Sequence, residues 1–243
     1  MRRSFPHNNL AALDALLADV RGQFERALIA VEGHYGMDGD TADLPALVEL
    51  KRRHGCFLMV DEAHALGVLG PTGKGLHEHH RVPGCDVDIW MGTLSKTLAG
   101  CGGYIAGERA LVELLKYTAP GFVYSVGIAP PLAAAALAAL QTMLKEPERV
   151  ARLQHNAALL LRLARAAGID TGSSQGHAIV PAIVGSSLKA ARLSKALFER
   201  GINVQPIVHP AVEEKAARLR FFVSHRHSQA QLEEAVSAVR ELL

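Results

Sequence analysis

The sequence predicts an α/β protein with a mostly parallel β-sheet and helices, followed by a smaller C-terminal α/β domain. Short apolar runs alternate with segments in which apolar residues recur at helical spacing, as in parallel sheets. Two of these runs, in segments 56–64 and 88–96, deliver polar residues at their C-terminal ends. After Gly168 the alternation of predicted strands and helices changes, which indicates a second, smaller domain.

Residues 1–145 are expected to form the larger domain. Leu13, Leu16, Leu17 and Val20 recur at helical spacing, which predicts the first helix. Pro130 and its neighbour suit the first turn of a long helix. The expected elements, in order, are a helix over 10–21, a strand over 27–31, a helix over 43–54, the two strands in 56–64 and 88–96, a strand over 103–106, a helix over 108–115 and the helix from Pro130.

Residues 146–243 are expected to form the small C-terminal domain, with the boundary inside the long helices. Pro181 cannot donate to a ladder, so its strand is expected at an edge or to be irregular. Gly168 and Gly201 are expected to close two of the helices. The expected elements are a helix over 148–167, a strand over 178–184, a helix over 188–200, strands over 202–204 and 219–224, and a helix over 229–242.

The polar residues at the ends of the predicted strands in segments 56–64 and 88–96 suit the cofactor pyridoxal phosphate (PLP). Ligands of parallel sheets bind at the carboxyl ends of the strands. Lys96 is the candidate for a Schiff base with the cofactor aldehyde, since burial makes a lysine amine nucleophilic. Asp61 is the candidate for keeping the pyridine nitrogen protonated, which makes the ring an electron sink. His64 lies where it can reach the phenolic oxygen or the substrate.

Thr93 and Ser95 lie in the turn before Lys96, where hydroxyls and backbone N–H groups can hold a phosphate. An Asp-Glu-Ala-His motif also occurs in nucleotide-driven helicases, which need an upstream phosphate-binding loop. The candidate loop at residues 70–75 lies downstream, has the wrong spacing and ends in Gly75 instead of a hydroxyl residue. The helicase interpretation is therefore disfavoured.

Composition excludes several other classes of function. A net charge of +2 indicates no basic surface for nucleic acid, and an aromatic content of 5% argues against stacking on bases. The longest aliphatic run, residues 131–140, is too short for a membrane span, and no apolar stretch follows the basic N-terminus as in a secretory signal. Three cysteines are too few for a disulfide framework, so we expect a reducing, cytoplasmic location.

Weaker signals are assigned to ordinary structure. The run His77-Glu78-His79-His80 has contiguous candidate ligands and no second cluster, so a solvated loop is favoured over a metal site. No metal is expected. Cys101 is expected to fill space in a glycine-rich turn, and His225 and His227 to lie in a polar turn.

Several segments together resemble the α-oxoamine synthases, which are fold-type I PLP enzymes such as 8-amino-7-oxononanoate synthase, 2-amino-3-oxobutyrate CoA ligase and serine palmitoyltransferase. The resemblance runs along nearly the whole chain in the family's order. The segments that carry it are 5–10, 37–40, 60–75, 86–89, 92–96, 102–107 and 217–220, with His227 shortly after.

The resemblance implies a PLP-dependent acyltransferase that condenses an amino acid with acyl-CoA or an acyl carrier protein, with decarboxylation. It implies that Lys96 holds the cofactor and transfers protons, Asp61 pairs with the pyridine nitrogen and His64 contacts the phenolic oxygen. Thr93 would bind phosphate, and Arg220 would hold the substrate carboxylate, which a guanidinium fork binds bidentately. A homodimer is implied as well.

The chain also departs from the family's pattern. The family's chains extend further at the N-terminus and include a glycine-rich turn and a stacking histidine. Gly36 stands where a serine is usual, and Val126 and Gly127 stand where polar residues are frequent. We therefore expect a fragment, a truncated product or one half of a split enzyme whose other half is a separate chain. Two alternatives stay open: an aminotransferase, and a non-catalytic fragment acting as a partner or dimerisation module.

Overall fold

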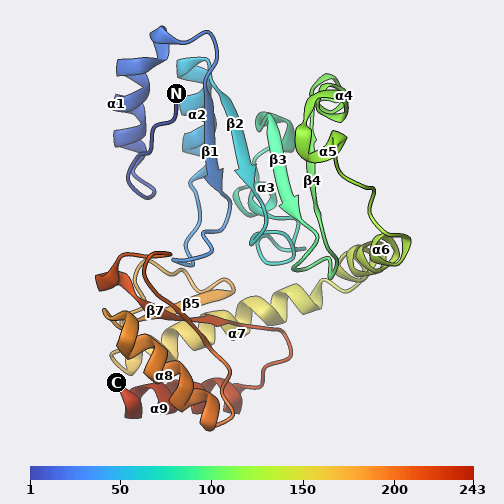
Figure 1. The fold of residues 1–243 in the computed structure, drawn as a ribbon. Coiled ribbons are helices and arrows are strands. Elements are labelled where there is room, and N and C mark those ends of the chain that lie inside the picture. Colours follow the sequence, from blue (N-terminus) through green and yellow to red (C-terminus); the bar gives the residue numbers. More distant parts are fainter. The chain divides into compact units, whose positions relative to one another are not determined.

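A computed structural model describes residues 1–243 and separates them into two compact units (Figure 1). Unit 1 consists of residues 1–34 and 41–145, and unit 2 consists of residues 35–40 and 146–243. The assignment of residues 1–145 and 146–243 to a large and a small domain stays a prediction. No helix is long and apolar enough to cross a membrane.

Unit 1 contains a four-stranded sheet in the order β1-β2-β3-β4. The strands are β1 (Leu28–Glu32), β2 (Phe57–Asp61), β3 (Ile89–Thr93) and β4 (Gly103–Gly107). β1, β2 and β3 are parallel, which confirms the predicted sheet, whereas β4 is antiparallel to β3. The reversal follows from the short connection over residues 94–102, which leaves no room for a crossover helix.

The two faces of this sheet differ in burial. Leu58 and Val60 of β2 are fully buried, whereas Phe57 on the opposite face is 49% exposed. Because side chains alternate along a strand, Asp61 shares the more exposed face with Phe57. The β2–β3 register pairs Asp61 with Met91, so Thr93 lies on that same face. The sheet therefore presents the polar strand ends on its exposed side.

Local signals explain where the helices of unit 1 begin and end. The Asp43 side chain accepts a hydrogen bond from the Ala46 N–H and starts α2, which Gly55 ends in a left-handed conformation. Residues 77–80, predicted as a loop, instead form a short helix that follows Gly75. The helices are α1 (Leu10–Val20), α2 (Leu44–His54), α3 (Leu76–His80), α4 (Arg109–Thr118), α5 (Pro120–Val123) and α6 (Pro130–Lys145), with 3₁₀ turns η1 (Arg21–Gln23) and η2 (Gly84–Asp86).

Unit 2 contains a three-stranded antiparallel sheet in the order β5-β7-β6 (Figure 1). The strand with Pro181 is at an edge, as predicted. The strand predicted over 202–204 is wrong in position, since the strand begins at Gln205, and the Val204 carbonyl accepts from the Ser194 hydroxyl at 2.6 Å. The strands are β5 (Ile179–Ile183), β6 (Gln205–Ile207) and β7 (Arg218–Phe222), with helices α7 (Glu148–Ala166), α8 (Ser187–Glu199) and α9 (Gln229–Leu242) and the 3₁₀ turn η3 (Glu214–Ala216).

The helices of unit 2 enclose one apolar core with the sheet. Leu197 of α8 and Leu219 of β7 are fully buried in it, and Val239 of α9 is 1% exposed. Ser228 starts α9 through a reciprocal capping box with Gln231. This core fixes β7, whose arginines are described below.

Candidate active site

The first half of the candidate site is the turn that follows β2. The Asp61 carboxylate accepts a hydrogen bond of 2.8 Å from the Ala63 N–H. The N–H groups of Ala65 and Leu66 donate to the Glu62 carbonyl, at 2.9 and 3.0 Å. These contacts end the strand and close a turn that contains His64, which is half-buried. A carboxylate and an imidazole thus follow one strand end, as the sequence predicted.

The second half is the loop that follows β3. The Thr93 and Ser95 hydroxyls are 2.7 Å apart, and Thr93 Oγ1 also accepts from the Ser95 N–H at 3.1 Å. Lys96 follows, and its carbonyl accepts from the Ala99 N–H. The two hydroxyls and the amine therefore come from one compact, largely exposed turn.

Lys96 is exposed, so the burial expected for its amine is wrong for this chain. The reason is local. The loop leaves β3 at Thr93, on the exposed face of the sheet, and Ser95 beside Lys96 is exposed too.

Thr97, which the sequence analysis missed, joins the two halves. Its hydroxyl donates to the Leu66 carbonyl at 2.7 Å. A Cβ on Gly67 would lie 2.3 Å from Thr97 Cγ2, so the two loops touch where glycine has no side chain. Thr97 and Leu66 are 31 residues apart in the sequence, so no local pattern indicates this contact. The contact holds the segment after Asp61 against the segment after Thr93.

This edge of unit 1 fits the groups that PLP needs. Asp61 and Thr93 lie on one face of neighbouring parallel strands, where ligands bind. The carboxylate suits a protonated ring nitrogen, and the Thr93–Ser95 hydroxyls suit a phosphate. The structure therefore brings together five of the six predicted site residues in one unit, at adjoining strand ends: Asp61, His64, Thr93, Ser95 and Lys96.

Glu62 is a buried carboxyl group that the sequence analysis assigned no role. It is 5% exposed, and its oxygens accept from the Leu76 N–H at 3.0 and 3.3 Å. Burial raises its pKa from 4.5 to about 7, the Leu76 hydrogen bond opposes that rise, and the Asp61 charge adds to it. The group therefore titrates near neutral pH.

Replacing Glu62 with glutamine is expected to remove a pH dependence of stability. Between pH 4.5 and about 7 the folded state binds a proton that the unfolded state has lost, so wild-type stability falls as pH rises through this window. The loss is about 3 kcal/mol and is complete above the folded pKa. Urea unfolding at pH 5 and pH 8 measures it, and a wild type and variant with equal pH dependence would contradict the assignment.

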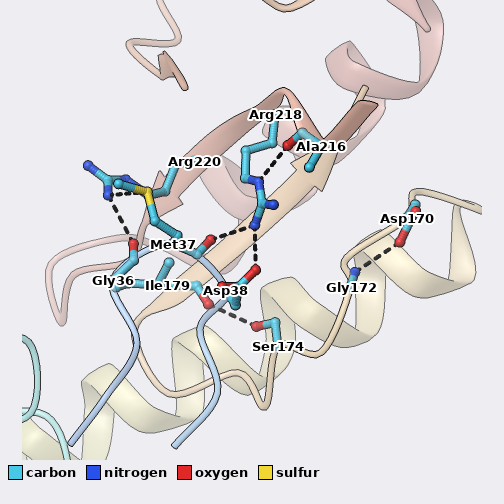
Figure 2. A network of polar contacts seen from close by, with 10 residues as sticks. All are labelled: Gly36, Met37, Asp38, Asp170, Gly172, Ser174, Ile179, Ala216, Arg218 and Arg220. Carbon is cyan, nitrogen blue, oxygen red and sulfur yellow. Dashed lines mark hydrogen bonds and ion pairs between the residues drawn. The ribbon is translucent and has the colours of Figure 1, made fainter. Parts of the chain in front are cut away.

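Arg220, the sixth predicted residue, lies on β7 of unit 2 (Figure 2). Its Nη1 donates to the Gly36 carbonyl at 2.9 Å and contacts Met37 Sδ at 3.4 Å. Its guanidinium carbon lies 4.7 Å from the centroid of the Phe222 ring, at the distance of a cation–π contact. Its role in binding a substrate carboxylate stays a prediction.

Arg218, two residues earlier on the same face of β7, was not predicted. Its side chain is 6% exposed, and its Nη1 donates to the Met37 carbonyl at 2.9 Å and to Asp38 Oδ1 at 2.7 Å (Figure 2). The period of two in Arg-Leu-Arg was the available signal, since it places both arginines on one face. The two arginines together hold residues 36–38 against β7.

No group of three or more His, Cys, Asp or Glu side chains is arranged to hold a metal ion. His77 instead contacts the edge of Trp90, with ring centroids 5.9 Å apart. The His80 ring lies 3.0 Å from the Ala42 carbonyl. The histidines of α3 therefore make contacts within unit 1.

Known proteins similar in sequence to this chain include 8-amino-7-oxononanoate synthases. The 8-amino-7-oxononanoate synthase of Symbiobacterium thermophilum is 42% identical over 96% of this chain, and that of Geobacter sulfurreducens is 44% identical over 98%. The chain spans 59% and 61% of these two proteins, about three fifths of their length.

Solved structures similar to this chain include serine palmitoyltransferases and an 8-amino-7-oxononanoate synthase. The serine palmitoyltransferase of Sphingomonas wittichii is 29% identical, with a TM-score of 0.88 over 97% of this chain and 59% of that one. A structure of SPT with PLP is 28% identical, with the same TM-score and coverage. The 8-amino-7-oxononanoate synthase of Francisella tularensis is 25% identical, with a TM-score of 0.81 over 98% and 68% of the two chains.

The family of class I and II aminotransferases matches residues 2–239. This match and the relatives above confirm the resemblance to the α-oxoamine synthases and the predicted α/β fold. The chain therefore belongs to the aminotransferase class I and II family.

Proposed function

We propose that this protein is a PLP-dependent acyltransferase of the α-oxoamine synthase type. It condenses an amino acid with an acyl thioester, of coenzyme A or an acyl carrier protein, and releases carbon dioxide to give an α-amino ketone. The observation that carries the proposal is the shared edge of unit 1, where Asp61, the Thr93–Ser95 hydroxyl pair and Lys96 follow neighbouring parallel strands.

Each residue of this edge has a proposed part. When bound, PLP supplies an electron sink that stabilises a carbanion at the amino acid's α-carbon. Lys96 attaches the cofactor and moves the α-proton through its Nζ. Asp61 holds a proton on the ring nitrogen, and His64 donates to the phenolic oxygen. Thr93 and Ser95 hold the phosphate with their hydroxyls.

Arg220 is proposed to bind the substrate carboxylate. Its contacts with Phe222 and the Gly36 carbonyl orient the guanidinium group. A planar guanidinium fork matches a carboxylate geometrically.

A homodimer in the cytoplasm is the proposed state of the protein. Support for a dimer comes from large apolar side chains exposed on the 114–128 stretch of unit 1, including Tyr117, Phe122, Tyr124 and Val126. All three cysteines are free thiols, which suits a reducing compartment. A separate chain that completes the active site is kept as a proposed partner.

The experiment that tests the function supplies the purified chain with PLP, a panel of amino acids and an acyl-CoA. Carbon dioxide and free thiol released in equal amounts would support the acyltransferase. Conversion of the amino acid to its keto acid without thiol release would instead indicate an aminotransferase. If the chain binds no PLP, the result would favour the alternative that it is a non-catalytic partner or dimerisation module.

A further inference from the structure

Glu62 belongs to a row of four residues that crosses the unit 1 sheet. Gly92 pairs with Tyr104, and the parallel registers of β1, β2 and β3 place Gly33 and Glu62 next in the same row. Glu62 follows Leu58 and Val60 on the buried face, opposite to the face that carries Asp61. Two carboxyl groups therefore lie back to back at the end of one strand.

Glycines leave the space that the side chains of Glu62 and Tyr104 occupy. A Cβ on Gly33 would lie 3.1 Å from Glu62 Oε1, and one on Gly92 would lie 2.4 Å from the Tyr104 hydroxyl oxygen. A Cβ on Gly75 would lie 1.9 Å from Glu62 Oε2. The Glu62 carboxyl group thus fills a notch between glycines, and the Tyr104 ring lies across Gly92.

The main chain of Glu62 holds the turn of the candidate site. Its N–H donates to the Met91 carbonyl at 2.7 Å, one step beyond the last residue of β2. Its side chain meanwhile accepts from the Leu76 N–H at the start of α3. One residue therefore connects β3, α3 and the turn that contains His64.

The ionisable groups around Glu62 are electrostatically coupled. Asp61 raises the pKa of Glu62 in addition to the larger effect of burial. Burial raises the pKa of Tyr104, and the charges of Glu62 and Asp61 raise it further. Gly33 after β1, Gly92 of β3 and the Leu76 N–H of α3 contribute no titratable group at this point. The titratable groups whose charges act with that of Glu62 are Asp61, on the opposite face of the sheet, and Tyr104 of β4.

We propose that Glu62 is a positioning residue for Asp61: its main chain holds the turn after β2, and its buried carboxyl group, anchored on the Leu76 N–H, sets the electrostatic field in which the Asp61 carboxylate acts. Where Asp61 pairs with a pyridine nitrogen, as in the proposed function, Glu62 sets the strength of that pairing. A carboxylate at Glu62 adds negative charge behind Asp61, and a protonated Glu62 does not.

The first test uses the chain without cofactor and follows the side-chain carboxyl carbons by NMR from pH 4 to pH 9. The chemical shift of the Asp61 carboxyl carbon is expected to change near pH 7 in the wild type, because Glu62 titrates there. Glu62→Gln, a neutral side chain of the same shape, is expected to lose this change. Glu78→Gln is the matched control, because Glu78 binds the Thr72 and Lys74 N–H groups of the same segment.

An Asp61 signal without an inflection near pH 7 in the wild type would overturn the proposal without any variant. An inflection that persists in Glu62→Gln would overturn it as well. A simple structural role for Glu62 would change stability but would leave the chemical shift of the Asp61 carboxyl carbon without a change near pH 7.

The second test measures binding of pyridoxine 5′-phosphate, which has no aldehyde and does not depend on Lys96. The wild type is expected to bind it about fivefold more tightly than Glu62→Gln at pH 8 and equally at pH 6. Equal affinities at both pH values would overturn the link to the cofactor nitrogen. Absence of binding in both proteins would contradict the proposed function, while the NMR titration would still decide the coupling of Glu62 and Asp61.

Discussion

Lys96→Ala is expected to abolish covalent retention of PLP and to lower the rate of the proposed condensation by about 10³-fold or more. Lys96 is the only lysine between Lys74 and Lys116 in the sequence, and it follows the Thr93–Ser95 turn at the candidate site. No other amine of this loop could attach the cofactor or move the α-proton. Absorbance near the visible edge and mass spectrometry after borohydride reduction measure the retention.

Lys74→Ala is the matched control, since Lys74 is exposed and donates to Glu78 through its backbone N–H. This variant is expected to retain the borohydride-fixed band at the wild-type level. Lys96→Arg keeps the positive charge but cannot attach an aldehyde in the same way, so it separates charge from covalent attachment. A fixed band of wild-type intensity in Lys96→Ala would show that another residue holds the cofactor.

The helices and strands could be predicted because they depend on local sequence pattern. The position of the candidate site could be predicted because it depends on strand direction. Apolar spacing located α2, whose Leu44 and Leu47 are buried as expected. Asp61 and Thr93 could be placed at the same edge of the sheet because parallel strands end at one edge. Neither inference needed a contact between residues far apart in the sequence.

Two features that the sequence analysis missed involve partners outside the local pattern. α3 follows Gly75, which offers no side chain as a cap, and its first N–H is bound by Glu62, 14 residues away. Just before β6, the Val204 carbonyl accepts from the hydroxyl of Ser194, 10 residues away. Such contacts form only once the chain is packed, so no pattern within a local window reveals them.

Arg218→Ala is expected to lower the free energy of unfolding of unit 2 by about 3 kcal/mol. The substitution leaves Asp38, the Met37 carbonyl and the Ala216 carbonyl without the guanidinium donor that binds all three. Breaking a buried ion pair costs about 3–5 kcal/mol, and the lower end applies because the Asp38 side chain is 33% exposed. Urea unfolding followed by circular dichroism measures the change.

A double-mutant cycle with Asp38→Ala separates the ion pair from the other contacts of Arg218. Asp38→Ala alone leaves a buried guanidinium group without its counter-ion, so the double variant is expected to be more stable than the sum of the two losses predicts. Arg192→Ala, at an exposed position of α8, is the control and is expected to change stability by no more than about 0.5 kcal/mol. Strictly additive losses would mean that Arg218 acts through the Met37 and Ala216 carbonyls alone. In either case Met37 and Asp38, which Arg218 holds, adjoin the Gly36 carbonyl that orients Arg220, so loss of Arg218 is also expected to disturb the position of the Arg220 guanidinium group, on which its proposed binding of a carboxylate depends.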